Sequence, residues 1–462
     1  MHKFTHRMII LLLVTMNLSV NAQQGMPTLI ELIDSAIKKD YVLDNQRLDI
    51  ELSVLDRQKL TNTFLPRLKV DGADAFALTS ISLSTKELKI PQLSLNIEEG
   101  RNRLTSTSNI VTLNTNASML IYSGGKISLL KKSVDEKIKG QKYLTEKEKQ
   151  DIIREVVSAY DMLALLKQVR IVLDESERRL AESMKIADKS FSYGLITKYE
   201  HQKIEVAQAQ VASKIKDYEG KRAVVQEKLY WLTNIPIERI ALIENNLQLI
   251  ENLHNNNSIE NRPEIKALDA FIVAQDYKIK AEKTWFVPKI YTAAALKYMG
   301  VLFGHMSSSK PILNGQKLSS ETPGIHISPM FQVGVGFSWD LFDGKEGKHE
   351  VEKATLERRK TENDKKDLTE KFELNLTKCR SDYAVSLSQV TVMEKQKETA
   401  SNALTQAIKE YKTGLIKTSQ LIDAEEDFEN AALGLIQTLY NQRRASVELL
   451  IATGSLRPEL FK

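Results

Sequence analysis

The sequence predicts a mainly α-helical protein with a membrane β part, in which long coiled-coil helical hairpins are joined to four strands per chain. Three observations predict this class. The chain repeats its own pattern at a spacing of about 220 residues. Each repeat contains a long polar segment with apolar residues at alternating steps of four and three, which indicates a coiled coil. Each repeat also contains stretches that alternate apolar with small or polar residues, which indicates strands.

The N-terminus has the features of a secretory signal peptide over residues 1–22. Lys3 and Arg7 flank a short apolar run at 8–14, and Val20-Asn21-Ala22 supplies the small-x-small cleavage pattern. The apolar run is too short to span a bilayer as a mature helix. A signal anchor is the alternative.

Composition argues against a nucleic-acid partner and against an enzyme. The 65 Lys and Arg and the 60 Asp and Glu give a formal charge of +5, with opposite charges interspersed as on solvated helix faces. The seven histidines show no HExxH or paired-ligand spacing, and a phosphate-loop-like stretch at 123–128 lacks its first glycine. We therefore predict no catalytic residue, no metal site and no cofactor. The single cysteine, Cys379, falls on the coiled-coil seam and is predicted to be a small buried apolar residue.

The internal duplication consists of three matched features in the same order. These are FLPRL (64–68) with FVPKI (286–290), LIYSGGK (120–126) with DLFDGKEGK (340–348), and YGLI (193–196) with TGLI (413–416). One such pair would be noise, but three ordered pairs at a nearly constant offset indicate that one half of the chain is a copy of the other.

Each repeat begins with a helix that ends at a proline, because proline cannot continue a helix and pushes its predecessor to extended geometry. These helices are predicted over 29–63 and 263–285, with helix-to-strand junctions at Pro66 and Pro288. Two strands follow in each repeat. Their predicted positions are about 67–79 and 107–122, then about 289–301 and 327–342, with polar loops at 80–106 and 302–325.

Each repeat ends in a long helical hairpin. The outgoing helices are predicted over 125–191 and 344–411, each on the order of 100 Å long. The return helices cover 195–233 and 415–453, so that Gly194 and Gly414 mark the tips. The predicted organisation is a first repeat at 23–233, an equatorial linker at 234–261, a second repeat at 262–453 and a tail at 454–462.

The last predicted strand has the clearest apolar face. The residues on this face are Phe331, Val333, Val335, Phe337, Trp339 and Leu341. Small or polar residues lie between them, as in a transmembrane barrel strand with one face toward lipid and the other toward a lumen. The same alternation would also suit half of a small sandwich. Because open sheet edges are not tolerated in lipid, four membrane strands would have to close with copies of the same chain.

With these features in order, the sequence resembles the TolC family of outer-membrane efflux proteins over essentially the whole mature chain. The resemblance lies in the helix ending in FLPRL, its echo ending in FVPKI, the YSGG and FDGKEGK junctions, and the two Gly-Leu-Ile tips. It implies a homotrimer whose twelve strands form one barrel in outer-membrane lipid, with a helical tunnel through the periplasm. It also implies a passive exit duct that docks to a periplasmic adaptor and takes its energy from an inner-membrane pump.

The tips have two interpretations. Gly194 and Gly414 supply the backbone freedom that a tight helix–helix turn needs, and this alone would explain them. The resemblance adds a docking surface for the adaptor. The residues assigned to it are Gly194, Leu195, Ile196, Gly414, Leu415 and Ile416. Exposed apolar residues at a solvated tip are consistent with a partner surface.

The resemblance also places a constriction near the tips. In the family, acids six and nine positions past the second tip glycine ring the closed end, and here these positions hold Gln420 and Asp423. Glu200 lies six past the first glycine, and Tyr411 matches a tyrosine that hydrogen-bonds to that acid. Ile416 replaces an arginine of the same lock. We therefore expect a gate that is latched differently or less tightly, whereas Asp423 could also be an ordinary solvated charge and Tyr411 plain seam packing.

A secreted coiled-coil structural or adhesive protein, with the strands as a small cap domain, is the alternative from another class. It explains the heptads but not the paired alternating strands inside each repeat. Within the channel interpretation, drugs, metals and secreted proteins all remain open as cargo.

Overall fold

A computed structural model describes residues 25–251, 253 and 258–461. The predicted signal peptide and most of the stretch 254–258 in the linker therefore lie outside the described residues. The described chain divides into two compact units. A helical unit is formed from Met1–Glu51, Ile138–Phe271 and Lys360–Lys462, and a strand-bearing unit from Leu52–Lys137 and Ile272–Arg359.

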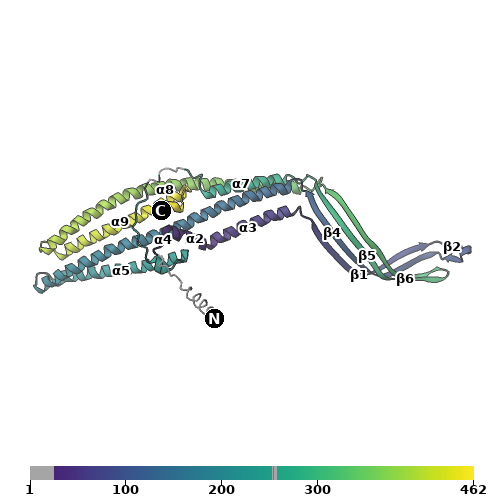
Figure 1. Cartoon of the computed structure of the whole chain (residues 1–462), viewed down its shortest axis with the longest axis horizontal. Helices are drawn as coiled ribbons and strands as arrows, with labels where there is room; N and C mark the ends of the chain where they lie inside the picture. The colour runs from purple at the N-terminus through teal and green to yellow at the C-terminus, as the bar shows by residue number, and fades with distance from the viewer. Residues whose placement is uncertain (1–24, 252, 254–257, 462) are drawn as a thin grey trace, which may run out of the picture. The chain divides into compact units, whose positions relative to one another are not determined.

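The helical unit contains two hairpins that lie side by side (Figure 1). The first is α4 (Lys126–Ser192) followed by α5 (Lys198–Thr233), and the second is α8 (Glu346–Lys412) followed by α9 (Thr418–Ala452). The first parts of α4 and α8 belong to the other unit. The linker contributes the short α6 (Ile237–Ile240), and the tail ends in a 3-10 helix, η3 (Pro458–Phe461).

The predicted coiled-coil seams form the core of this unit. On α4 the buried seam residues are Ile152, Val156, Ala159, Leu163, Leu166, Leu173, Leu180 and Ala187. On α8 they are Leu376, Cys379, Tyr383, Val390, Leu404, Ala407 and Tyr411. Burial raises the pKa of the Cys379 thiol, with Glu448 and Asp382 acting in the same direction. The thiol therefore stays protonated, as a small apolar residue of the seam would.

The predicted first helix is interrupted. It divides into α2 (Leu29–Lys39) and α3 (Tyr41–Asn62), separated by Asp40. Asp40 has extended backbone angles, and its carboxylate accepts a hydrogen bond from the N–H of Leu43 over 2.7 Å, which caps the new helix. The prediction of one continuous helix over 29–63 was wrong because it ignored this cap. Its counterpart in the second repeat is α7 (Pro263–Glu282).

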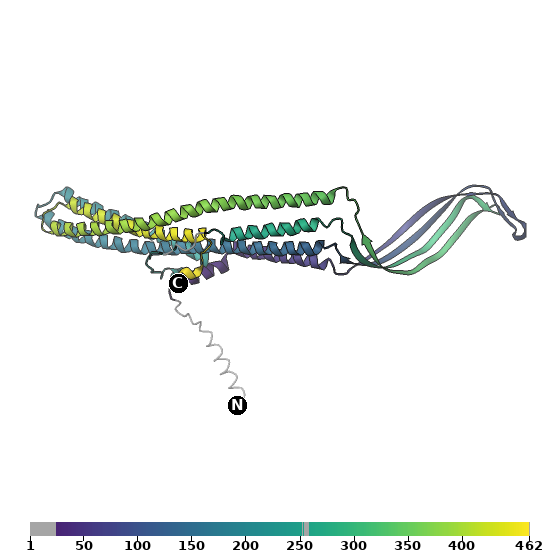
Figure 2. The same ribbon diagram turned by 90° about the horizontal axis from the view of Figure 1, so that it is seen from above.

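The strand-bearing unit is built on four long antiparallel strands in the order β1–β4–β5–β6 (Figure 2). They are β1 (Arg67–Thr85), β4 (Gly100–Tyr122), β5 (Lys289–Leu313) and β6 (Gln316–Ser338). A turn element follows β1, consisting of β2 (Leu88–Ile90), η2 (Pro91–Leu93) and β3 (Leu95–Ile97). Pro66 and Pro288 directly precede β1 and β5, as predicted for the junctions.

Two predicted loops are largely strand. β1 and β4 stay paired as far as Thr85 opposite Gly100, and β5 and β6 as far as Leu313 opposite Gln316. The predicted loops at 80–106 and 302–325 were therefore wrong over most of their length. These stretches are mostly polar, but their Ser and Thr residues are compatible with a strand once a neighbour supplies the ladder hydrogen bonds. β6 also ends at Ser338, so that Trp339 and Leu341 lie beyond the strand.

Among the helices of the described residues, none combines the length and the apolar character needed to cross a membrane.

Candidate functional site at the hairpin tips

The two tips have the same backbone construction. Gly194 has φ +68° and Gly414 has φ +75°, and no atom lies within 4 Å of where a Cβ would be at either position. The left-handed backbone, not crowding, is therefore what favours glycine here. Leu195 N–H donates to the carbonyl of Ser190 over 2.8 Å, and Leu415 N–H to that of Glu410 over 2.9 Å. Each bond closes the last turn of the helix in the pattern of a Schellman motif.

Each tip exposes one leucine and half-buries one isoleucine. Leu195 is 75 % exposed and Leu415 is 76 % exposed. Ile196 and Ile416 are partly buried, and Ile416 packs against the small core cluster formed by Leu404, Ala407, Tyr411 and Leu421. The apolar tip surface that the sequence predicted is thus reduced mainly to the two leucines.

The predicted acid of the first hairpin contacts the second hairpin. Glu200 is partly buried, and its Oε2 accepts a hydrogen bond from the backbone N–H of Ser419 over 3.2 Å. Ser419 lies in the first turn of α9, where backbone N–H groups have no partner within the helix and the helix dipole favours a negative charge. Glu200 therefore caps α9 from the neighbouring hairpin.

Tyr411 does not make the hydrogen bond that the resemblance implied. The residue is 8 % exposed, and its buried hydroxyl has no hydrogen-bond partner among the described residues. Gln420 is exposed and its side-chain oxygen accepts from the N–H of Lys417 over 3.0 Å, while Asp423 is exposed. Among the described residues, the four predicted constriction residues are therefore not joined in one hydrogen-bond network.

Sequence reasoning missed a buried charge cluster further along the hairpins. Arg179 on α4 donates to Glu425 on α9 through Nε at 2.9 Å and Nη2 at 2.8 Å, and Ser176 Oγ donates to Glu425 over 2.7 Å. Lys214 on α5 pairs with Glu429 on α9. The side chains of Glu425 and Glu429 are 8 % and 4 % exposed. A single sequence carries no signal for this cluster, because its members look like ordinary helix charges.

A second buried ion pair joins the same helices. Asp161 on α4 accepts from Arg443 on α9 over 2.8 Å, and the Asp161 side chain is 5 % exposed. Burial raises the pKa of Asp161 above its ordinary value, and Arg443 opposes that rise.

The predicted apolar face of the last strand is exposed in the isolated chain. Phe331, Val333, Val335 and Phe337 are between 68 % and 73 % exposed. Their partners on β5 continue the same face. These partners are Leu296, Ala294, Thr292 and Ile290. Trp339 and Leu341 are also exposed, but Trp339 lies past the strand and its indole N–H donates to the carbonyl of Phe286 over 2.8 Å.

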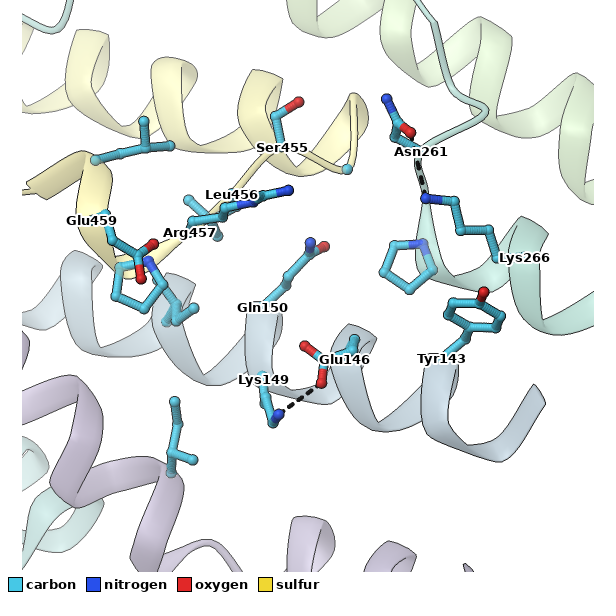
Figure 3. Close-up of a pocket in the computed structure, with 16 residues that line it drawn as sticks. Tyr143, Glu146, Lys149, Gln150, Asn261, Lys266, Ser455, Leu456, Arg457 and Glu459 are labelled. Carbon is cyan, nitrogen blue, oxygen red and sulfur yellow. Dashed lines mark hydrogen bonds and ion pairs between the residues drawn. The ribbon is translucent and has the colours of Figure 1, made fainter. Parts of the chain in front are cut away.

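One cavity of about 700 Å³ lies away from the tips, between α4, the start of α7 and the C-terminal residues (Figure 3). Several of its polar side chains bond to each other: Lys149 pairs with Glu146 over 2.7 Å, and Lys266 donates to Asn261 over 3.4 Å. None of the predicted site residues lines it. We assign no ligand to this cavity.

Comparison with known proteins agrees with this architecture. Residues 255–455 match the family model described as outer membrane efflux protein. This part of the chain belongs to the outer membrane efflux protein family. The resemblance predicted from the sequence is thereby confirmed, and so is the predicted outer-membrane location. The matched family is described as one of outer membrane efflux proteins, which supports an outer-membrane exit channel.

Solved structures extend the likeness of fold to nearly the whole chain. The outer-membrane channel OprN has a TM-score of 0.71 at 16 % identity, covering 93 % of this chain and 90 % of that one. CusC gives 0.69 at 14 % identity, covering 94 % and 95 %. The Campylobacter jejuni CmeC outer membrane channel gives 0.68 at 17 % identity, covering 92 % and 85 %. No curated protein matches the sequence.

Proposed function

We propose that three copies of this chain form a passive exit duct, with the strands in the outer membrane and the hairpins in the periplasm. The observation that carries the proposal is the sheet β1–β4–β5–β6. Its outer strands β1 and β6 each have one long-strand partner in the described chain, and one face is apolar and exposed. In lipid, backbone groups at an open edge are too costly to leave unpaired. Four strands are also too few to close on themselves, so that β6 of one copy would pair with β1 of the next.

The tips would be the end distant from the membrane, where a periplasmic adaptor docks. Leu195 and Leu415 support this part of the proposal. Each is about three-quarters exposed, so packing within the chain does not explain why an apolar residue is present at the turn. In such an assembly an inner-membrane pump would supply the energy, as the resemblance to the TolC family implies. CusC and CmeC, which share the fold, are both described as channels.

Crosslinking across the proposed seam tests the barrel. In a Cys379→Ala background, we would combine Ala73→Cys on β1 with Gln332→Cys or Gly334→Cys on β6, all on the face opposite the apolar residues. We expect disulfide-linked dimers and trimers from outer-membrane fractions, together with a trimer band that heating converts to monomer. As a matched control, Ala73→Cys paired with a cysteine on the central strand β5, such as Ala295→Cys, should give no ladder between chains. A water-soluble monomer would instead favour a secreted coiled-coil protein.

A further inference from the structure

The buried charge cluster described above ties three helices of the two hairpins together. It consists of Ser176, Arg179, Lys214, Glu425 and Glu429. Glu425 follows Gly414 by 11 residues, which places it roughly 16 Å along the hairpin from the tip. A small shift of α9 against α4 and α5 at this cluster would therefore become a larger displacement at the tip.

The energetics of the cluster resist such a shift. Glu425 receives two guanidinium N–H bonds and one hydroxyl bond, and its side chain is 8 % exposed. A buried ion pair adds little net stability over apolar packing, but separating it strands a charge in a low-dielectric site. Such a pair consequently selects one arrangement of the helices that contribute to it.

The tip itself offers few charged side chains that could hold the two hairpins in one arrangement. Ile416 and Gln420 are neutral, Gln420 caps its own helix, and Asp423 is exposed. Glu200 bonds to a backbone N–H, not to a side chain. The ion pairs Arg179–Glu425 and Lys214–Glu429, which join the two hairpins, lie deeper in the hairpins.

Tyr411 lies beside the buried charge cluster. It lines a cavity of about 30 Å³ together with Arg179, Ser183 and Glu425. A cavity of this size accommodates about one water molecule, and Arg179, Ser183 and Glu425 supply polar groups in its lining. One water would give the buried Tyr411 hydroxyl the partner that it lacks among the described residues, and would connect it to the Arg179–Glu425 pair.

We propose that the buried charge cluster is the latch that holds α9 against α4 and α5 and so keeps the end of the duct closed. This inference rests on the proposed function. It assigns Arg179, Lys214, Glu425 and Glu429 as positioning residues of the closed state, with Tyr411 joined to them through a water.

Single-channel conductance of purified trimers in planar bilayers tests the latch. Glu425→Gln and Arg179→Gln should each raise closed-state conductance about tenfold or more, because each removes the opposite charge across the two helices. Arg179 would keep only Glu175 on its own helix, and Glu425 only the hydroxyl of Ser176. The double variant Arg179→Met with Glu425→Leu should return conductance toward the unmodified level, since it removes both charges and keeps apolar volume. Glu426→Gln, the exposed neighbour on the same helix, should leave conductance unchanged.

The possible results distinguish the proposed latch from the proposed exit duct. If the single variants form normal trimers whose closed-state conductance equals that of the unmodified protein, the latch is wrong and the duct stands. If the unmodified protein forms no trimer and no pore, the duct itself fails. Should Glu425→Gln not assemble, Lys214→Gln replaces it, because the Lys214 side chain is 44 % exposed and its loss is milder. Lys216→Gln, whose exposed partner is Glu219, is then the control, and equal conductance of the two lysine variants would overturn the latch.

Discussion

Glu200 on the first hairpin accepts a hydrogen bond from the backbone N–H of Ser419 on the second, over 3.2 Å. The two residues are 219 positions apart, so this bond directly links the two halves of the duplicated chain near their tips. It predicts that Glu200→Ala exposes the first turn of α9 and costs about 1 kcal/mol, as for loss of a helix cap. Faster hydrogen exchange at the Ser419 amide would report the loss. Glu205→Ala, an exposed change on the same helix, should leave that amide protected, and equal exchange in both variants would contradict the cap.

Gly414 should tolerate alanine poorly although there is space for a Cβ. The cost is about 1 kcal/mol, because φ is +75° and a side chain strains that backbone. Gly220 offers a matched control within α5, where the surroundings are equally open but the backbone is helical. Gly220→Ala should therefore stabilise the protein by about 0.5–1 kcal/mol. Thermal unfolding of the detergent-extracted protein measures both, and a shift of the same sign for the two variants would refute the backbone argument.

Gly336 should be required where its neighbour Gly334 is not. A Cβ at Gly336 would lie 2.6 Å from Cζ of Tyr291, its cross-strand partner, whereas a Cβ at Gly334 would meet nothing within 4 Å. Gly336→Ala should cost about 1–3 kcal/mol by displacing the ring, seen as less assembled trimer in the outer membrane. Adding Tyr291→Ser should restore assembly, since the two changes are coupled through one contact. Failure of that rescue, or an equal defect in Gly334→Ala, would count against the packing explanation.

The Asp161–Arg443 pair predicts a pH-dependent defect. Burial already raises the pKa of Asp161 above 3.8, and Arg443 restrains that rise. Arg443→Met should raise the pKa further. Because the folded state then binds the proton more tightly than the unfolded state, stability falls as pH rises from about 4 through the raised folded pKa. The melting temperature of Arg443→Met should therefore be lower at pH 8 than at pH 5. Arg443→Met with Asp161→Asn should lack this difference, and a variant that is more stable at pH 8 would reverse the assigned cause.

Much of the architecture follows from local patterns in the sequence. The 3.5-residue seam of α4 and α8, the glycine turns and the alternation from Phe331 to Phe337 are all set by neighbours along the chain, so a single sequence reveals them. The duplication adds the order of the elements. The prediction failed at Asp40, where a side-chain cap divides a helix, and after Ser338, where the alternation outlasts the strand.

The tertiary structure alone decided which polar stretches are strands and which charges meet. Residues 80–85 and 100–106 are mostly polar, and they become strand because each provides the other's ladder partners. Arg179 and Glu425 are 246 positions apart, and nothing in either helix sets them opposite one another. Their contact depends on the register with which α4 packs against α9. That register is a property of two long seams together, which is why the sequence predicted the hairpins and their tips, while the charges between them were visible only in the folded chain.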